Sequence, residues 1–218
     1  ALPCLRNSRM NIREFIGFGG VVLTADVYGN EDHPCVVLLP SLTQTRKVWE
    51  SAAKALAQAG RYVISLDLRG HGGSDSPKDC NYSLEAFMGD LVAVLSQLES
   101  RPVLVGSNFG GWIGLAAIGN TSAPIATGLV LTNLPPEFQS LNNESIAKTV
   151  SERASSDDFE KNLFAGGFDF IELQNKLEPA AKNLKLPTLL VRGIDIQISS
   201  SGATQRFADL IPQAEISE

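Results

Sequence analysis

The chain has 218 residues, of which 44% are hydrophobic, and a formal net charge of −6. This length is enough for one domain with a substantial core. An acidic chain argues against nucleic acid or an anionic membrane as a partner, because those partners select clustered Lys and Arg. No apolar run reaches the roughly 18 residues that a membrane span needs. We therefore expect a small organic ligand or substrate as partner, with no nucleic acid and no membrane.

The three cysteines are widely spaced and odd in number. Such usage suits reduced thiols in a cytoplasmic protein better than a disulfide framework. No spacing among the cysteines and the two histidines indicates a metal site, so we expect neither a metal nor another cofactor.

Hydrophobic periodicity predicts strands that alternate with helices. Period-two alternation and short continuous apolar runs indicate strands, whereas apolar residues at helical spacing indicate helices. Gly19-Gly20 indicates a hairpin between the first two strands, and Ser83 is placed to cap a helix. The alternation implies a mostly parallel, doubly wound sheet. In chain order we expect strands over 12–17, 21–28 and 35–39, a helix over 45–59, a strand over 62–66, a helix over 83–98, a strand over 102–106, a helix over 109–118 and a strand over 125–132.

The pattern changes at residue 135 to polar, Ser-, Asn- and Glu-rich fragments that extend to residue 183. An insertion of this length suggests a reduced cap or lid over a site, carried by a core made of residues 1–134 and 184–218. After it we expect a strand over 187–191, a helix over 201–210 and a last strand that begins at Ala214. We expect the sequence given to lack a last helix after this strand. A poorly covered terminal strand edge would promote pairing with another copy of the chain.

The most informative stretch is Val103–Gly111, a buried strand that runs into a glycine-framed turn and then a helix. It has the pattern of a nucleophile elbow, G-x-Nu-x-G, in which the flanking glycines allow a sharp turn that exposes the central side chain. The central residue is Asn108. An amide has no proton to give up and almost no nucleophilicity, so this residue cannot perform covalent attack. Ser107 precedes it and should point to the opposite face.

Two further motifs follow the expected order around the elbow: Asp67-Leu-Arg-Gly-His-Gly-Gly-Ser74 and Pro187-Thr-Leu-Leu-Val-Arg-Gly193. With them, the chain resembles the α/β-hydrolase superfamily, in its branch of small esterases, haloperoxidase-like and epoxide-hydrolase-like members. The resemblance implies an α/β-hydrolase-like sheet with a short cap insertion. It also implies a reaction that needs a nucleophile, a histidine base, an acid and two backbone N–H donors.

The resemblance places this chemistry on specific residues. Asn108 occupies the nucleophile position, and Gln197 the acid position, with Asp195 two residues earlier. The family's histidine follows the last strand, and the sequence given ends before such a loop. His71 belongs to the Arg-Gly-His-Gly loop, which we expect to shape the turn near the mouth of the site, and His33 falls in a surface loop.

The two oxyanion donors implied by the resemblance are backbone groups. The Phe109 N–H begins the helix after the elbow and has the helix dipole behind it. The second donor comes from the segment after the third strand and falls on Leu42. Pro40 and Ser41 replace the family's His and Gly there, so the donor depends on a serine adopting a conformation that glycine finds easier.

Three hypotheses follow. The first is a ligand-binding protein derived from a hydrolase of small esters, in which conventional triad hydrolysis is weak or absent. The second is an active hydrolase of unusual mechanism, in which Asn108, Ser41, Ser107 or Asp195 positions a water molecule or a reactive substrate. The third is an incomplete chain of a carboxylic-ester or epoxide hydrolase.

Overall fold

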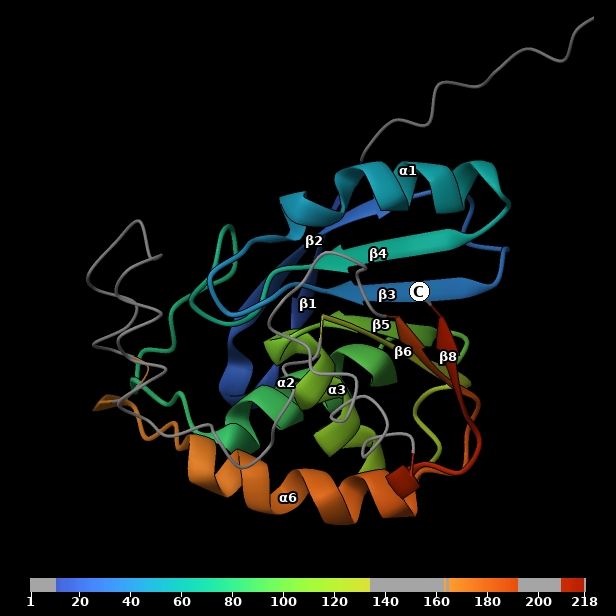
Figure 1. Ribbon diagram of the computed structural model, residues 1–218. Helices are drawn as coiled ribbons and strands as arrows, with labels where there is room; N and C mark the ends of the chain where they lie inside the picture. The colour runs from blue at the N-terminus through green and yellow to red at the C-terminus, as the bar shows by residue number, and fades with distance from the viewer. Residues whose placement is uncertain (1–10, 134–162, 164, 192–208, 218) are drawn as a thin grey trace, which may run out of the picture.

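The computed structural model describes residues 11–133, 163, 165–191 and 209–217, and these contain one eight-stranded sheet (Figure 1). Two antiparallel strands at one edge are followed by six that run parallel, which confirms the mostly parallel sheet. From edge to edge the strands are β1 (Asn11–Ile16), β2 (Val22–Tyr28), β4 (Tyr62–Leu66), β3 (Cys35–Leu39), β5 (Val103–Ser107), β6 (Gly128–Thr132), β7 (Thr188–Val191) and β8 (Ala214–Ser217).

Helices cover both faces of the sheet. One face carries α1 (Glu50–Gln58), and the other carries α2 (Leu84–Ser96), α3 (Phe109–Gly119) and α6 (Phe170–Asn183) (Figure 1). A 3-10 turn over Arg46–Trp49 precedes α1, so the helix predicted over 45–59 begins with a tighter turn. None of the described helices has the length and apolar character that a membrane span requires.

The larger part of the core lies between the sheet and α2, α3 and α6. Every residue of α3 is buried, because this helix lies between the sheet and α6. The two helices approach closely where a Cβ on Gly119 would lie 2.4 Å from the carbonyl oxygen of Ala180. Thus α6, although it falls inside the interval 135–183, contributes to the core. Most of that interval and of the helix expected over 201–210 lies outside the described residues, so the division into core and cap stays a prediction.

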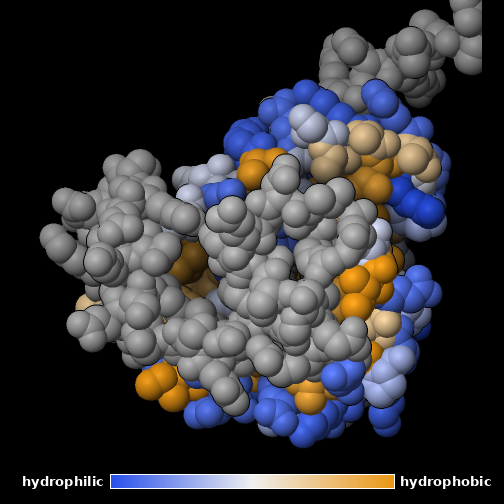
Figure 2. Space-filling model, in the orientation of Figure 1, coloured by the Kyte–Doolittle hydropathy of each residue, from blue (hydrophilic) through white to orange (hydrophobic). Residues whose placement is uncertain are grey.

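The α1 face of the sheet is covered unevenly. A smaller apolar cluster fills the space beneath α1. Further along the sheet, residues that alternate with fully buried ones are only half-buried: Val103, Val105, Val130, Leu189 and Val191. Figure 2 shows hydrophobic surface over this part of the sheet. Beyond it β8 is an edge strand that carries the exposed Ile216.

Candidate functional site

The connection between β5 and α3 is a sharp turn centred on Asn108. Its backbone has φ 46° and ψ −114°, close to the first central position of a type II′ turn, which is dominated by glycine. For a residue with a Cβ, such a conformation costs on the order of 1–3 kcal/mol and persists only where the surrounding structure imposes it. The Asn108 N–H donates to the Thr132 carbonyl at 3.0 Å, and its own carbonyl accepts from the Trp112 N–H at 3.0 Å. The turn expected of a nucleophile elbow is therefore present, with an amide at its centre.

The glycines around Asn108 are required by backbone contacts. A Cβ on Gly106 would lie 2.4 Å from the Gly111 Cα, so the strand could not approach the helix that follows it. A Cβ on Gly110 would lie 2.4 Å from the Pro40 carbonyl oxygen. The second contact brings the first turn of α3 against the end of β3, where the segment with Ser41 and Leu42 begins.

Two backbone donors are candidates to bind a ligand oxygen. Within the described part of the chain, neither the Phe109 N–H nor the Leu42 N–H has a hydrogen-bond partner. The Phe109 N–H lies at the N-terminus of α3, where the helix dipole favours developing negative charge. Ser41 does not adopt a positive φ, so serine is accommodated here without the freedom of glycine. Its N–H donates to the Gln44 side chain at 3.4 Å.

Of the other candidate residues, the structure describes Ser107 and His33 but not the two at the acid position. Gln197 and Asp195 lie outside the described residues, so their roles stay predictions. Ser107 is buried at the end of β5, and His33 is exposed in the loop before β3. Asn108 itself is half-buried.

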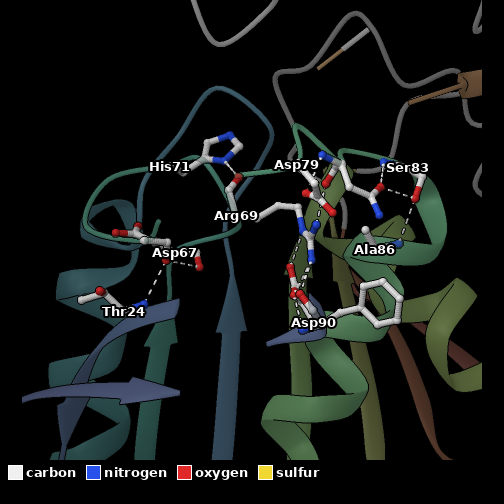
Figure 3. Close-up of polar contacts among 11 residues, drawn as sticks. Thr24, Asp67, Arg69, His71, Asp79, Ser83, Ala86 and Asp90 are labelled. Atoms are coloured by element: carbon white, nitrogen blue, oxygen red, sulfur yellow. Dashed lines mark hydrogen bonds and ion pairs between the residues drawn. The ribbon is translucent and has the colours of Figure 1, made fainter. Parts of the chain in front are cut away.

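The loop from Asp67 to Asp75 follows β4 and wraps around the carboxylate of Asp67 (Figure 3). This carboxylate accepts from the Gly73 N–H at 2.8 Å and from the Arg46 N–H at 2.6 Å, and it is paired with the Arg46 guanidinium. The Ser74 hydroxyl donates to the Asp67 carbonyl at 2.9 Å and accepts from the Thr24 N–H at 2.9 Å. The polar side chains of this motif thus hold the loop together and also join it to Arg46 and Thr24.

A buried ion pair fastens the same loop to α2. Arg69 donates from Nε and Nη2 to the Asp90 carboxylate at 2.6 and 2.7 Å, and from Nη1 to the Asn81 carbonyl at 2.5 Å (Figure 3). Asp90 also accepts from the Phe18 N–H at 2.8 Å, which adds the β1–β2 turn. Burial raises the pKa of Asp90, and the hydrogen bonds and charge of Arg69 oppose this. The pair thus joins the Asp67–Asp75 loop, α2 and the β1–β2 turn.

A second charged network was missed by sequence reasoning. Arg46 bridges Asp67 and Asp26, with 2.9 Å between its Nε and the Asp26 carboxylate, and Lys47 reaches the same carboxylate at 2.5 Å. Burial alone would raise the pKa of Asp26, but the hydrogen bonds and charges of Lys47 and Arg46 outweigh it and leave that pKa below its usual value. No spacing in the sequence signals this network, because its members come from β2, the end of β4 and the turn before α1.

His71 lies inside the loop and is 7% exposed. Its Nδ1 lies 2.9 Å from the Arg69 carbonyl oxygen, and its Nε2 is hydrogen-bonded to the Leu42 carbonyl oxygen. Burial lowers the pKa of His71, and the two carbonyls and the charge of Asp67 offset this only in part. The neutral ring has one N–H and so donates to one of these two carbonyls, in keeping with the expectation that His71 shapes the loop.

Comparison with known proteins agrees with this architecture. The family model described as the alpha/beta hydrolase fold matches residues 34–189. The sn-1-specific diacylglycerol lipase ABHD11 of Mus musculus is 41% identical over 85 residues, which are 38% of this chain and 27% of the lipase. Bifunctional epoxide hydrolase 2 of Sus scrofa is 36% identical over 80 residues, 36% of this chain and 14% of that protein. The chain thus matches well under half the length of these relatives.

Solved structures extend the likeness to nearly the whole chain. An esterase from Rhodococcus sp. ECU1013, RhEst1, superposes with a TM-score of 0.72 over 95% of this chain and 90% of its own, at 24% sequence identity. At that identity the likeness establishes the fold alone. The family model covers most of the chain, including the elbow and the Asp67–Asp75 loop, and the chain belongs to the α/β-hydrolase fold family.

Proposed function

We propose that the chain binds a small, uncharged organic molecule with a carbonyl group at the elbow, and that conventional triad hydrolysis there is weak or absent. The observation that carries the proposal is the strained backbone of Asn108. Strain of this kind is typical of functional sites, and it is kept here although the side chain cannot attack a substrate.

The chemistry of the neighbouring groups supports a carbonyl oxygen as the atom recognised. The Phe109 and Leu42 N–H groups are donors without partners in the described chain, and an ester, lactone or ketone oxygen accepts from such donors. An amide at position 108 adds neutral donors and acceptors but no charge. A neutral ligand therefore fits better than a carboxylate or an ammonium ion.

Calorimetric titration with ethyl butyrate, alongside a hydrolysis assay with p-nitrophenyl butyrate, tests the proposal. We expect measurable binding, hydrolysis close to the buffer rate, and a several-fold loss of affinity in Asn108→Ala. Asn120→Ala, at the opposite end of α3, is the matched control and should bind as the wild type does. Rapid hydrolysis that Asn108→Ala abolishes would overturn the proposal.

A hydrolase of unusual mechanism is the second candidate. The two N–H donors that have no partner among the described residues favour it, because such donors can stabilise an oxyanion whatever the nucleophile is. In that case a broad screen of esters and epoxides finds turnover in the wild type that falls in Asn108→Ala. Asn108→Ser alone should gain little, because a serine without a base is a weak nucleophile.

We also propose that two copies associate through β8. Its outer edge is free of strand pairing among the described residues, and its residues from Glu215 to Ser217 are exposed. Light scattering of the wild type and of Ile216→Lys tests this, since a charge on an edge strand opposes pairing. A wild type that stays monomeric at high concentration would contradict it.

A further inference from the structure

The segment that carries the Leu42 N–H is held by the Asp67–Asp75 loop. The Leu42 carbonyl is hydrogen-bonded to the His71 ring, and the Arg46 N–H, four residues later, donates to Asp67. We propose that His71 is a positioning residue for the ligand site, which fixes the Leu42 backbone so that its N–H can bind the ligand's carbonyl oxygen. This inference rests on the proposed function.

The Leu42 backbone is restrained from both sides. The carbonyl of Leu42 itself is hydrogen-bonded to His71. The carbonyl of the preceding residue, Ser41, accepts from the Gln44 N–H at 3.0 Å. The Leu42 side chain is buried in the core. Because the peptide unit is planar and trans, the Leu42 N–H points opposite to the Ser41 carbonyl. The bond from His71 to the Leu42 carbonyl restrains the next peptide unit, so the Leu42 backbone is held on both sides of its Cα. The Leu42 N–H is thus oriented while it has no partner of its own in the described chain.

His71 can serve as an anchor because its own position is fixed. Its N–H donates to the Leu68 carbonyl at 3.0 Å, and its carbonyl accepts from the Ser74 N–H at 2.9 Å. Both ring nitrogens face carbonyl oxygens, of Arg69 and Leu42. A neutral imidazole has one N–H, and the tautomer with that proton on Nε2 donates to Leu42. To position Leu42, residue 71 needs a hydrogen-bond donor at the place of Nε2. It does not need to exchange a proton with a substrate.

Three substitutions separate the donor from the shape of the ring. In His71→Gln the amide nitrogen takes the place of Nε2 and keeps the donor to Leu42, whereas in His71→Asn it takes the place of Nδ1 and loses it. His71→Phe keeps the ring and removes both nitrogens. Each variant is first compared with the wild type by urea unfolding, so that binding is measured only with variants that are folded.

The binding readout uses ethyl butyrate and its matched ether, ethyl butyl ether, in which a methylene replaces the carbonyl. We expect His71→Phe and His71→Asn to weaken ethyl butyrate binding about three- to tenfold, the range of one hydrogen bond, with ether binding within twofold. His71→Gln should restore ester binding. Equal losses for ester and ether, or unchanged ester binding in His71→Phe, would overturn the inference.

Amide hydrogen exchange without ligand keeps the inference testable if the wild type binds neither compound, an outcome that would count against the proposed function alone. The Gln44 amide reports on the Ser41 turn, and the Ile113 amide in α3 serves as the internal reference. We expect exchange at Gln44 to rise at least tenfold in His71→Phe and to stay near wild type in His71→Gln, with Ile113 unchanged. An unchanged Gln44 amide in His71→Phe would refute the positioning role.

Discussion

The two sides of the candidate site are built by different physical means. On the elbow side, Gly106 and Gly111 touch across a turn of a few residues, and the contacts are steric and between backbones. On the other side, the Asp67–Asp75 loop is held by buried charges and hydrogen bonds, such as Arg69 to Asp90, 21 residues apart, and Thr24 to Ser74, 50 residues apart. The elbow is therefore a local device, whereas the loop is a junction of distant segments.

The largest expected effect comes from breaking that junction. Arg69→Met should lower the free energy of unfolding by about 3–5 kcal/mol, because it leaves the Asp90 carboxylate buried without its cation. Urea unfolding at neutral pH measures this change. The double variant Arg69→Met with Asp90→Leu should recover part of the loss, since it removes the uncompensated charge as well. A loss below about 1 kcal/mol in the single variant would show that the pair does not hold the loop.

At the elbow, we expect added side-chain volume, and not a lost charge, to lower the free energy of unfolding. Gly110→Ala should cost about 1–3 kcal/mol, because its Cβ would lie 2.4 Å from the Pro40 carbonyl oxygen and 2.8 Å from the Leu39 Cβ. Gly128→Ala is the matched control, since a Cβ there meets nothing closer than 3.5 Å. Thermal or urea unfolding distinguishes the two. Equal effects at both positions would mean that the close approach at the elbow does not constrain the residue type.

The same contrast explains what the sequence could predict. The strands and helices, Ser83 as a cap and the sharp turn at Asn108 depend on neighbours in sequence, through periodicity, capping and glycine spacing. The pairing of Arg46 with Asp26 and Asp67 depends on which strands lie side by side, and no local pattern encodes that order. His71 could be placed in the loop from its motif, but its bond to Leu42 could not, because the two residues meet only in the folded chain.

A smaller effect is expected at the start of α2, where the loop side ends in a local hydrogen bond. The Ser83 hydroxyl accepts from the Ala86 N–H at 3.3 Å and donates to the Asn81 side chain at 2.8 Å. Ser83→Ala should therefore lower the free energy of unfolding by about 1 kcal/mol. Ser96→Ala, at the other end of the helix, removes only a hydroxyl bonded to the Val92 carbonyl and should cost less. A greater loss in Ser96→Ala than in Ser83→Ala would contradict this assignment.

The smallest expected effect lies in the pH dependence of the loop side, because the burial of Asp26 opposes the cations that favour its charge. The pKa of Asp26 in the folded protein lies below the usual value of an aspartate, which applies in the unfolded chain, so the unfolded state binds more protons as the pH falls. The stability due to Asp26 is thus fully present above about pH 5 and is lost as the pH drops through its folded pKa. Unfolding measured from pH 5 to pH 3 should show a shallower decline in Asp26→Asn than in the wild type. The elbow, held by sterics, adds no such dependence, so parallel curves for the two proteins would mean that charge at Asp26 does not stabilise the loop side.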